Sequence, residues 1–324
     1  MIYIPIMKTL QAEQLALRTL SPEKRNKVKP LLQYVPGKRL KPILEENPYL
    51  HFFVEFPNLP FNTKIRTLEQ KEAKFLELKN SFSNFYPAIT ITEEEEPRQL
   101  TQHVLKLLKK FDKLLVKGDL IDKQGNLKGY NLLSFTALYS CLPLEKVYFL
   151  IDFEQVKDFS FLDKNIPIIR SLFKEAQLGF SATVWPPDQS QFEKGSSIIF
   201  DNIPFKIWKK HKNIFNFYSD YLTENPLSPV IEEPKPLTII PYFKLTSLDG
   251  EYCCIIRATS REIVDVKEAA QLAIEQYGFI HEKDCNGCSE LQEIADTSND
   301  KIGSPMSRKK LSFAHHLEVI SALI

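Results

Sequence analysis

Short apolar segments recur along the first two thirds of the chain, each followed by a polar or aromatic residue and separated by stretches with helical periodicity. Strands that are buried on both faces read as continuous apolar runs, and helices between them indicate a parallel sheet. We expect these strands, each given with the residue that closes it: 3–7 with Lys8, 30–32 with Gln33, 52–54 with Glu55, 88–91 with Thr92, 114–116 with Lys117, 147–151 with Asp152, 180–184 with Trp185, and 214–218 with Asp220.

Eight strand–helix units predict an α/β fold of the (β/α)8 TIM-barrel-like type over residues 1–225. Residues 118–145 and 186–212 look irregular, so an open doubly wound sheet is the alternative. In a closed barrel, the chemistry sits at the carboxyl ends of the strands. The sequence therefore indicates where a site would lie, without naming a reaction.

Residues 226–324 are predicted to be a C-terminal elaboration packed on the barrel. A stretch with four prolines opens it and reads as a linker or strap. A β-hairpin is expected from 238–245 and 252–257, followed by a helix over 261–277 and a tail.

Composition excludes several classes of function. The hydrophobic fraction is 43%, so the chain can bury a large core. The net charge is +1, so the chain as a whole has no electrostatic field that would attract nucleic acid or a membrane surface. With no secretory signal, no apolar stretch of membrane length and five cysteines, we expect a cytoplasmic protein without a membrane partner. No Gly-rich phosphate loop is present, and nucleic acid is not an expected partner.

The polar residues at the strand ends are the first candidate site. Lys8, Glu55, Lys117, Asp152 and Asp220 would converge on one rim, with Glu13 close behind the first strand. A lysine beside carboxylates can act as a base, an electrophile or a Schiff-base former, and two carboxylates can share acid and base roles. The competing interpretation is a set of structural salt bridges at the barrel mouth.

Three further residues are binding candidates. Trp185 precedes two prolines and could stack on a ligand, or pack as a lid. His315 and His316 precede an apolar run that we take for a strand, which would point them to opposite faces. One histidine could then line a pocket while the other packs in the core.

A possible metal motif lies near the C-terminus. His281, Cys285 and Cys288 form a His-x3-Cys-x2-Cys pattern, and two cysteines at this spacing can bind one zinc ion together with a histidine. A solvent-exposed loop with incidental thiols is the competing interpretation. Because the ligand set is incomplete, the sequence assigns no metal and no cofactor.

The two ends of the chain resemble the "beta protein" family of phages and bacterial mobile elements. The resemblance rests on an ordered set of segments along nearly the whole chain: Tyr3-Ile4-Pro5-Ile6-Met7-Lys8, Leu20-Ser21-Pro22-Glu23, Lys29-Pro30-Leu31-Leu32, Ile151-Asp152-Phe153, Asp220-Tyr221, Gly303-Ser304-Pro305 and His315-His316-Leu317. The chain departs from the pattern at Ala12, Gln33 and Ser219, where the family is expected to have Gly, Glu and Gly. It also has Glu290-Leu291-Gln292 in place of Trp-Gly-Asp.

Two functions of different class remain open. The resemblance implies a component of an anti-phage defence or phage–host conflict system that acts through partner proteins. The strand-end residues instead indicate a barrel hydrolase or lyase acting on a nucleotide or another phosphorylated ligand. The two are compatible, because a defence protein can be an enzyme.

Overall fold

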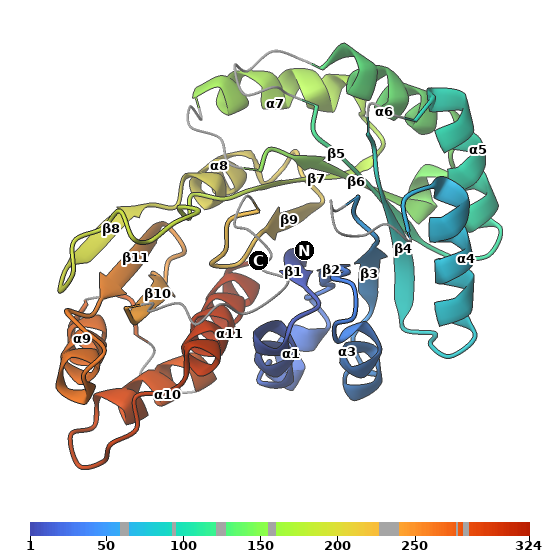
Figure 1. The fold of residues 1–324 in the computed structure, drawn as a ribbon. Coiled ribbons are helices and arrows are strands. Elements are labelled where there is room, and N and C mark those ends of the chain that lie inside the picture. The colour runs from blue at the N-terminus through green and yellow to red at the C-terminus, as the bar shows by residue number, and fades with distance from the viewer. Residues whose placement is uncertain are drawn as a thin grey trace. The chain divides into compact units, whose positions relative to one another are not determined.

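Eight parallel strands close into a barrel in a computed structural model of the chain (Figure 1). The structure describes residues 1–58, 65–92, 95–120, 128–154, 160–226, 240–276, 278–280 and 285–324. The barrel strands, in order, are β1 (Ile2–Lys8), β2 (Leu31–Gln33), β3 (Phe52–Glu55), β4 (Phe85–Thr90), β5 (Leu114–Gly118), β6 (Val147–Asp152), β7 (Gln177–Ala182) and β9 (Phe217–Asp220). The predicted closed barrel is thereby confirmed, because β9 pairs with both β7 and β1.

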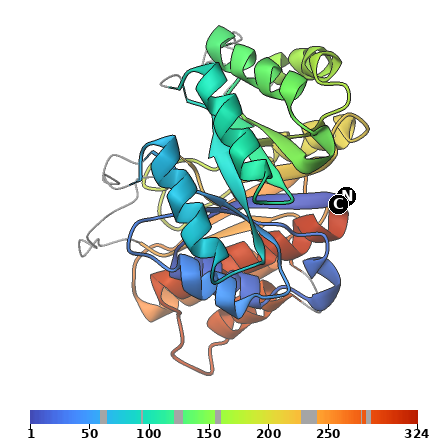
Figure 2. The same ribbon diagram turned by 90° about the vertical axis from the view of Figure 1, so that its right-hand side faces the viewer.

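Helices lie between successive barrel strands. They are α3 (Leu40–Glu46), α4 (Leu68–Lys79), α5 (Pro97–Leu108), α6 (Gly129–Cys141), α7 (Ser160–Leu172) and α8 (Ile203–His211). Thr67 caps α4 in a capping box with Gln70, and Pro97 occupies the first turn of α5. Helices α4, α5 and α6 pack side by side outside the strands (Figures 1 and 2).

The barrel interior is a packed apolar core. Its members come from most of the strands: Ile4, Ile6, Leu31, Phe53, Ala88, Leu115, Tyr148, Leu150, Phe217 and Tyr221. Gly179 leaves room for one of the larger rings, because a Cβ there would lie 2.3 Å from the ring of Phe217. Side chains therefore fill the barrel below its carboxyl-end rim.

The chain divides into two compact units. The first consists of 1–10, 25–183 and 207–221 and contains the barrel, and the second consists of 11–24, 184–206 and 222–324. The second unit has helices α1 (Gln11–Arg18), α9 (Ile263–Glu275), α10 (Asn286–Ala295) and α11 (Pro305–Leu323), and strands β8 (Ser197–Asp201), β10 (Tyr242–Thr246) and β11 (Tyr252–Arg257). The short helix α2 (Pro22–Arg25) ends at the boundary between the two units.

The predicted hairpin is present, and a third strand extends it. β10 pairs antiparallel with β11, which pairs antiparallel with β8. The expectation that 186–212 is irregular was therefore wrong for β8. That strand pairs with a partner more than 50 residues away in the chain, so local sequence carried no signal of the pairing.

Helix α11 overturns another expectation. His315 and His316 lie in its interior and not on a strand. Ser304 caps the helix by accepting a hydrogen bond from Ser307 N, and Pro305 follows it, so Ser304-Pro305 marks the start of a helix. No helix in the part of the chain that the structure describes is long and apolar enough to cross a membrane.

Candidate functional site

Three charged residues that the sequence places at strand ends meet at the barrel rim. Lys117 Nζ lies 3.2 Å from Glu55 Oε2 and 3.6 Å from Asp152 Oδ2, so one ammonium bridges two carboxylates. Glu55 ends β3, Lys117 is the penultimate residue of β5 and Asp152 ends β6. All three side chains are buried. We call Glu55, Lys117 and Asp152 the strand-end cluster.

Electrostatics fix the charges of two of these groups. Burial favours a neutral Lys117, but the attraction of Glu55 and Asp152 outweighs it and raises the lysine pKa. Burial likewise disfavours ionised Glu55, yet Lys117 and the hydrogen bonds from Thr90 and Gln33 lower its pKa. Lys117 is therefore a cation at neutral pH. This charge favours an electrophilic role over a base or Schiff-base role.

Tyrosine hydroxyls complete the surroundings of the acids. Tyr221 donates a hydrogen bond to Asp152 Oδ2, and Ser181 donates one to Asp152 Oδ1 at 2.9 Å. Tyr3 donates to Asp220 Oδ1 at 2.6 Å. Burial and the neighbouring carboxylate raise the pKa of both tyrosines well above the ordinary value, so both remain protonated donors.

Sequence reasoning missed Glu154, which lies just past the end of β6. Its φ of 46° is in the left-handed region, which is unusual for a residue with a side chain. Burial, and then the charge of Asp152, raise its carboxyl pKa. A strained backbone and a carboxyl with a raised pKa are both common at catalytic positions. The only sequence signal was its position two residues after a strand-end aspartate.

Lys8 and Asp220 also lie at strand ends on the rim of the barrel. Lys8 ends β1 and is in register with Gln33, which is in register with Glu55. Gln33 Nε2 donates to Glu55 Oε2 at 3.0 Å. Asp220 ends β9 and has Tyr3 as its hydrogen-bond donor. Charged side chains thus lie at the strand ends around much of the barrel rim.

The remaining predicted residues belong to the second unit. Trp185 is buried against Cys253 and Ile255 and meets Phe200 edge-on, so its surroundings are those of a core residue. His316 Nδ1 lies 2.6 Å from Thr246 Oγ1. Glu13, a predicted binding residue on α1, is also buried, and its Oε1 lies 3.6 Å from Lys309 Nζ.

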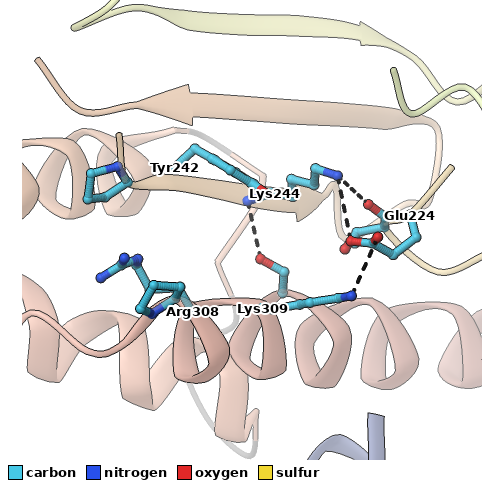
Figure 3. A pocket seen from close by; sticks show the side chains of 9 residues that line it. Glu224, Tyr242, Lys244, Arg308 and Lys309 are labelled. Atoms are coloured by element: carbon cyan, nitrogen blue, oxygen red, sulfur yellow. Dashed lines mark hydrogen bonds and ion pairs between the residues drawn. The ribbon is translucent and has the colours of Figure 1, made fainter. Parts of the chain in front are cut away.

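A cavity of about 60 Å³ lies in this second unit (Figure 3). Its walls include Glu224, Tyr242, Lys244, Arg308 and Lys309. Lys309 Nζ is 3.5 Å from Glu224 Oε2, and Lys244 Nζ is 4.0 Å from Glu224 Oε1. With three basic side chains and one carboxylate on its walls, the cavity has the charge and the size to hold a small anionic group.

The two lysines of this cavity have opposite pKa shifts. Burial lowers the pKa of Lys244 to about 8, so a substantial neutral fraction exists near physiological pH. Burial would also lower that of Lys309, but Glu224 and Glu13 together raise it. Burial raises the pKa of Tyr242 to about 12. Lys244 is thus the group of this cavity best suited to act as a base or nucleophile.

Two cysteines and a histidine of the second unit form a compact group. Cys285, Cys288 and His315 are all buried, which overturns the interpretation of an exposed loop with incidental thiols. Among the residues that the structure describes, these three form the group that could hold a metal ion. His281, the other member of the predicted motif, lies outside the described residues.

The chain also matches a known protein family over nearly its whole length. The Beta protein family model matches residues 3–321, nearly the whole chain. The chain belongs to the Beta protein family. No curated protein matches it. In this Beta protein family member, Ser219 donates a hydrogen bond to the carbonyl of Ile4 at 2.6 Å, and Gln33 donates to Glu55, so two of its departures from the expected pattern have structural roles.

Proposed function

We propose that this Beta protein family member is a barrel hydrolase or lyase whose acid–base centre is the strand-end cluster together with Glu154 and Tyr221. The observation that supports it is the contrast between two neighbouring groups. Lys117 is held as a cation, whereas Glu154 has a raised carboxyl pKa. Neighbouring groups with such divergent proton affinities divide electrostatic and proton-transfer roles in enzymes.

In this proposal each residue has a separate task. Glu154 donates or accepts the proton, because its raised pKa brings it closer to neutral pH. Lys117 stabilises negative charge that develops on the substrate. Asp152 holds both Lys117 and the hydroxyl of Tyr221, so it sets the position of the two donors.

The proposed substrate is a nucleotide or another phosphorylated ligand. Lys117 can contact a phosphoryl oxygen, but Glu55 and Asp152 both lie within 4 Å of its ammonium. The cluster is therefore negative overall and would repel a bare phosphate. A magnesium complex of the ligand is the form that suits this charge, so substrate screens need magnesium.

The test is a turnover assay with the purified chain, MgCl2 and a panel of nucleotides and sugar phosphates, followed by phosphorus NMR. Glu154→Gln should lower kcat by roughly 10²–10⁴-fold, the usual size of a general acid–base contribution. Tyr221→Phe should lower it less. Glu145→Gln, the same change at an exposed position, is the matched control and should leave kcat unchanged. Equal turnover by the wild type and Glu154→Gln would contradict the proposal.

A second function rests on the family and on one feature of the rim. Its acids have internal partners: Thr90, Gln33 and Lys117 for Glu55, and Tyr3 for Asp220. A satisfied cluster also suits a scaffold in anti-phage defence that acts through partner proteins. Phage plating with the neighbouring genes separates the two. Undiminished protection by Glu154→Gln and Tyr221→Phe supports the scaffold, and lost protection by stably folded variants supports catalysis.

A further inference from the structure

The second unit contains two thiols and an imidazole that the proposed function does not use. Cys285 is the N-cap of α10, Cys288 lies in the first turn of the same helix, and His315 lies within α11. Exposure is 3% for each cysteine and 0% for His315. Buried thiols usually have apolar neighbours and no charged or basic partner, so their convergence on an imidazole calls for an explanation.

The distances match those around a tetrahedral metal ion. With Zn–S near 2.3 Å and Zn–N near 2.0–2.1 Å, a tetrahedral site places sulfur and nitrogen ligands about 3.6 Å apart. Here His315 Nδ1 lies 3.7 Å from Cys285 Sγ and 3.3 Å from Cys288 Sγ. All three donor atoms lie within 4.8 Å of one another, so one ion can reach each of them.

The hydrogen bond of the opposite ring nitrogen prepares His315 for this role. His315 Nε2 lies 2.7 Å from the backbone carbonyl oxygen of Thr246. A carbonyl only accepts hydrogen bonds, so Nε2 carries a proton, and in the neutral imidazole Nδ1 then presents its lone pair toward the thiols. A metal-binding histidine typically donates its other N–H to a carbonyl or carboxylate in this way.

Gly287, between the two cysteines, permits the approach of the helices. A Cβ at this position would lie 2.6 Å from the carbonyl oxygen of Leu311 and 2.7 Å from the backbone nitrogen of His315. Both are backbone atoms and cannot move aside cheaply. The Cys-Asn-Gly-Cys turn therefore fits directly against α11, which brings both sulfur atoms to the imidazole.

We propose that Cys285, Cys288 and His315 form a zinc site that joins α10 to α11. Thiolate and imidazole ligands favour zinc over magnesium or calcium, which prefer oxygen. Three protein ligands leave the fourth position of the ion to a water molecule or another donor. The site is separate from the strand-end cluster, so it stands or falls independently of the enzymatic proposal.

The experiment uses the untagged full chain, purified with a thiol reductant and without chelator. Elemental analysis should find one zinc per chain in the wild type and in Cys141→Ser, which changes an exposed cysteine. Cys288→Ser and His315→Gln should each lower zinc content at least tenfold. Cys254→Ser changes a buried cysteine outside the group and controls for the loss of a buried thiol.

A cobalt titration of the wild type keeps the test valid if the variants do not fold. Co²⁺ added to metal-free chain should give tetrahedral visible bands and thiolate charge-transfer absorption, and excess Zn²⁺ should remove both. Three results would overturn the proposal: zinc retained in full by Cys288→Ser, no thiolate band in the wild type, or a Cys285–Cys288 disulfide in the chain as purified.

Discussion

Lys117 and Glu55 form a buried ion pair in which the two charged atoms lie 3.2 Å apart, while Asp152 shares the same ammonium. Removing Lys117 would leave two carboxylates buried without the cation that they share. We therefore expect Lys117→Met to lower the free energy of unfolding by about 3–5 kcal/mol, as for other broken buried pairs. Urea denaturation measures this value.

The double variant Lys117→Met/Glu55→Gln tests the coupling. Because it removes one uncompensated charge along with the ammonium, it should lose less stability than the sum of the two single variants. Strict additivity of the single effects would show that the pair is not energetically coupled.

Glu154 should stabilise the fold less than a glycine does at the same position. Its left-handed backbone is strained for any residue with a Cβ, and burial disfavours its ionised carboxyl. Glu154→Gly should therefore be at least as stable as the wild type, and more stable than Glu154→Ala by about 1 kcal/mol. Thermal unfolding of the three proteins measures the order. An alanine variant as stable as the glycine variant would mean that the backbone stores no strain there.

The stability of the fold should depend on a neutral hydrogen-bond donor at position 33. Gln33→Glu restores the residue expected from the family, but it places a second carboxylate beside Glu55 in a partly buried part of the rim. We expect a loss of about 1–3 kcal/mol at pH 7 that shrinks in acid, where one carboxyl becomes protonated. Gln33→Ala removes only the hydrogen bond and should lack this pH dependence. Equal stability of Gln33→Glu and wild type at pH 7 would contradict the expectation.

Lys244 should make stability rise with pH. Its pKa falls from 10.5 to about 8 on folding, so between these values the unfolded chain binds more protons than the folded chain. Stability therefore increases across this window, by at most about 1.4 kcal/mol per pH unit for one proton. Lys244→Met removes this dependence, and Glu224 keeps Lys309 as its ion-pair partner.

Urea denaturation of wild type and Lys244→Met at pH 7, 8, 9 and 10 gives the difference. The stability of the wild type relative to the variant should rise with pH. A constant difference would mean that Lys244 titrates alike in both states.

The hydrophobic pattern was sufficient to predict the barrel, because strands buried on both faces leave continuous apolar runs. It also placed Glu55, Lys117 and Asp152 at strand ends, and parallel strands bring such ends to one rim. The pattern could not single out Glu154, since a left-handed φ and a raised pKa arise from the surroundings and not from the residue type.

The sequence by itself determined the closed parallel barrel, the rim at which its acids and lysine gather, and membership of the Beta protein family. Tertiary structure alone decided which groups are paired, which carboxyl has a raised pKa, and that His315 meets Cys285 and Cys288 across two helices. The physical reason is range. Burial patterns and the succession of strands and helices can be recognised from residues close together in the sequence. Charge pairing and ligand geometry depend on atoms that folding brings together from distant parts of the chain.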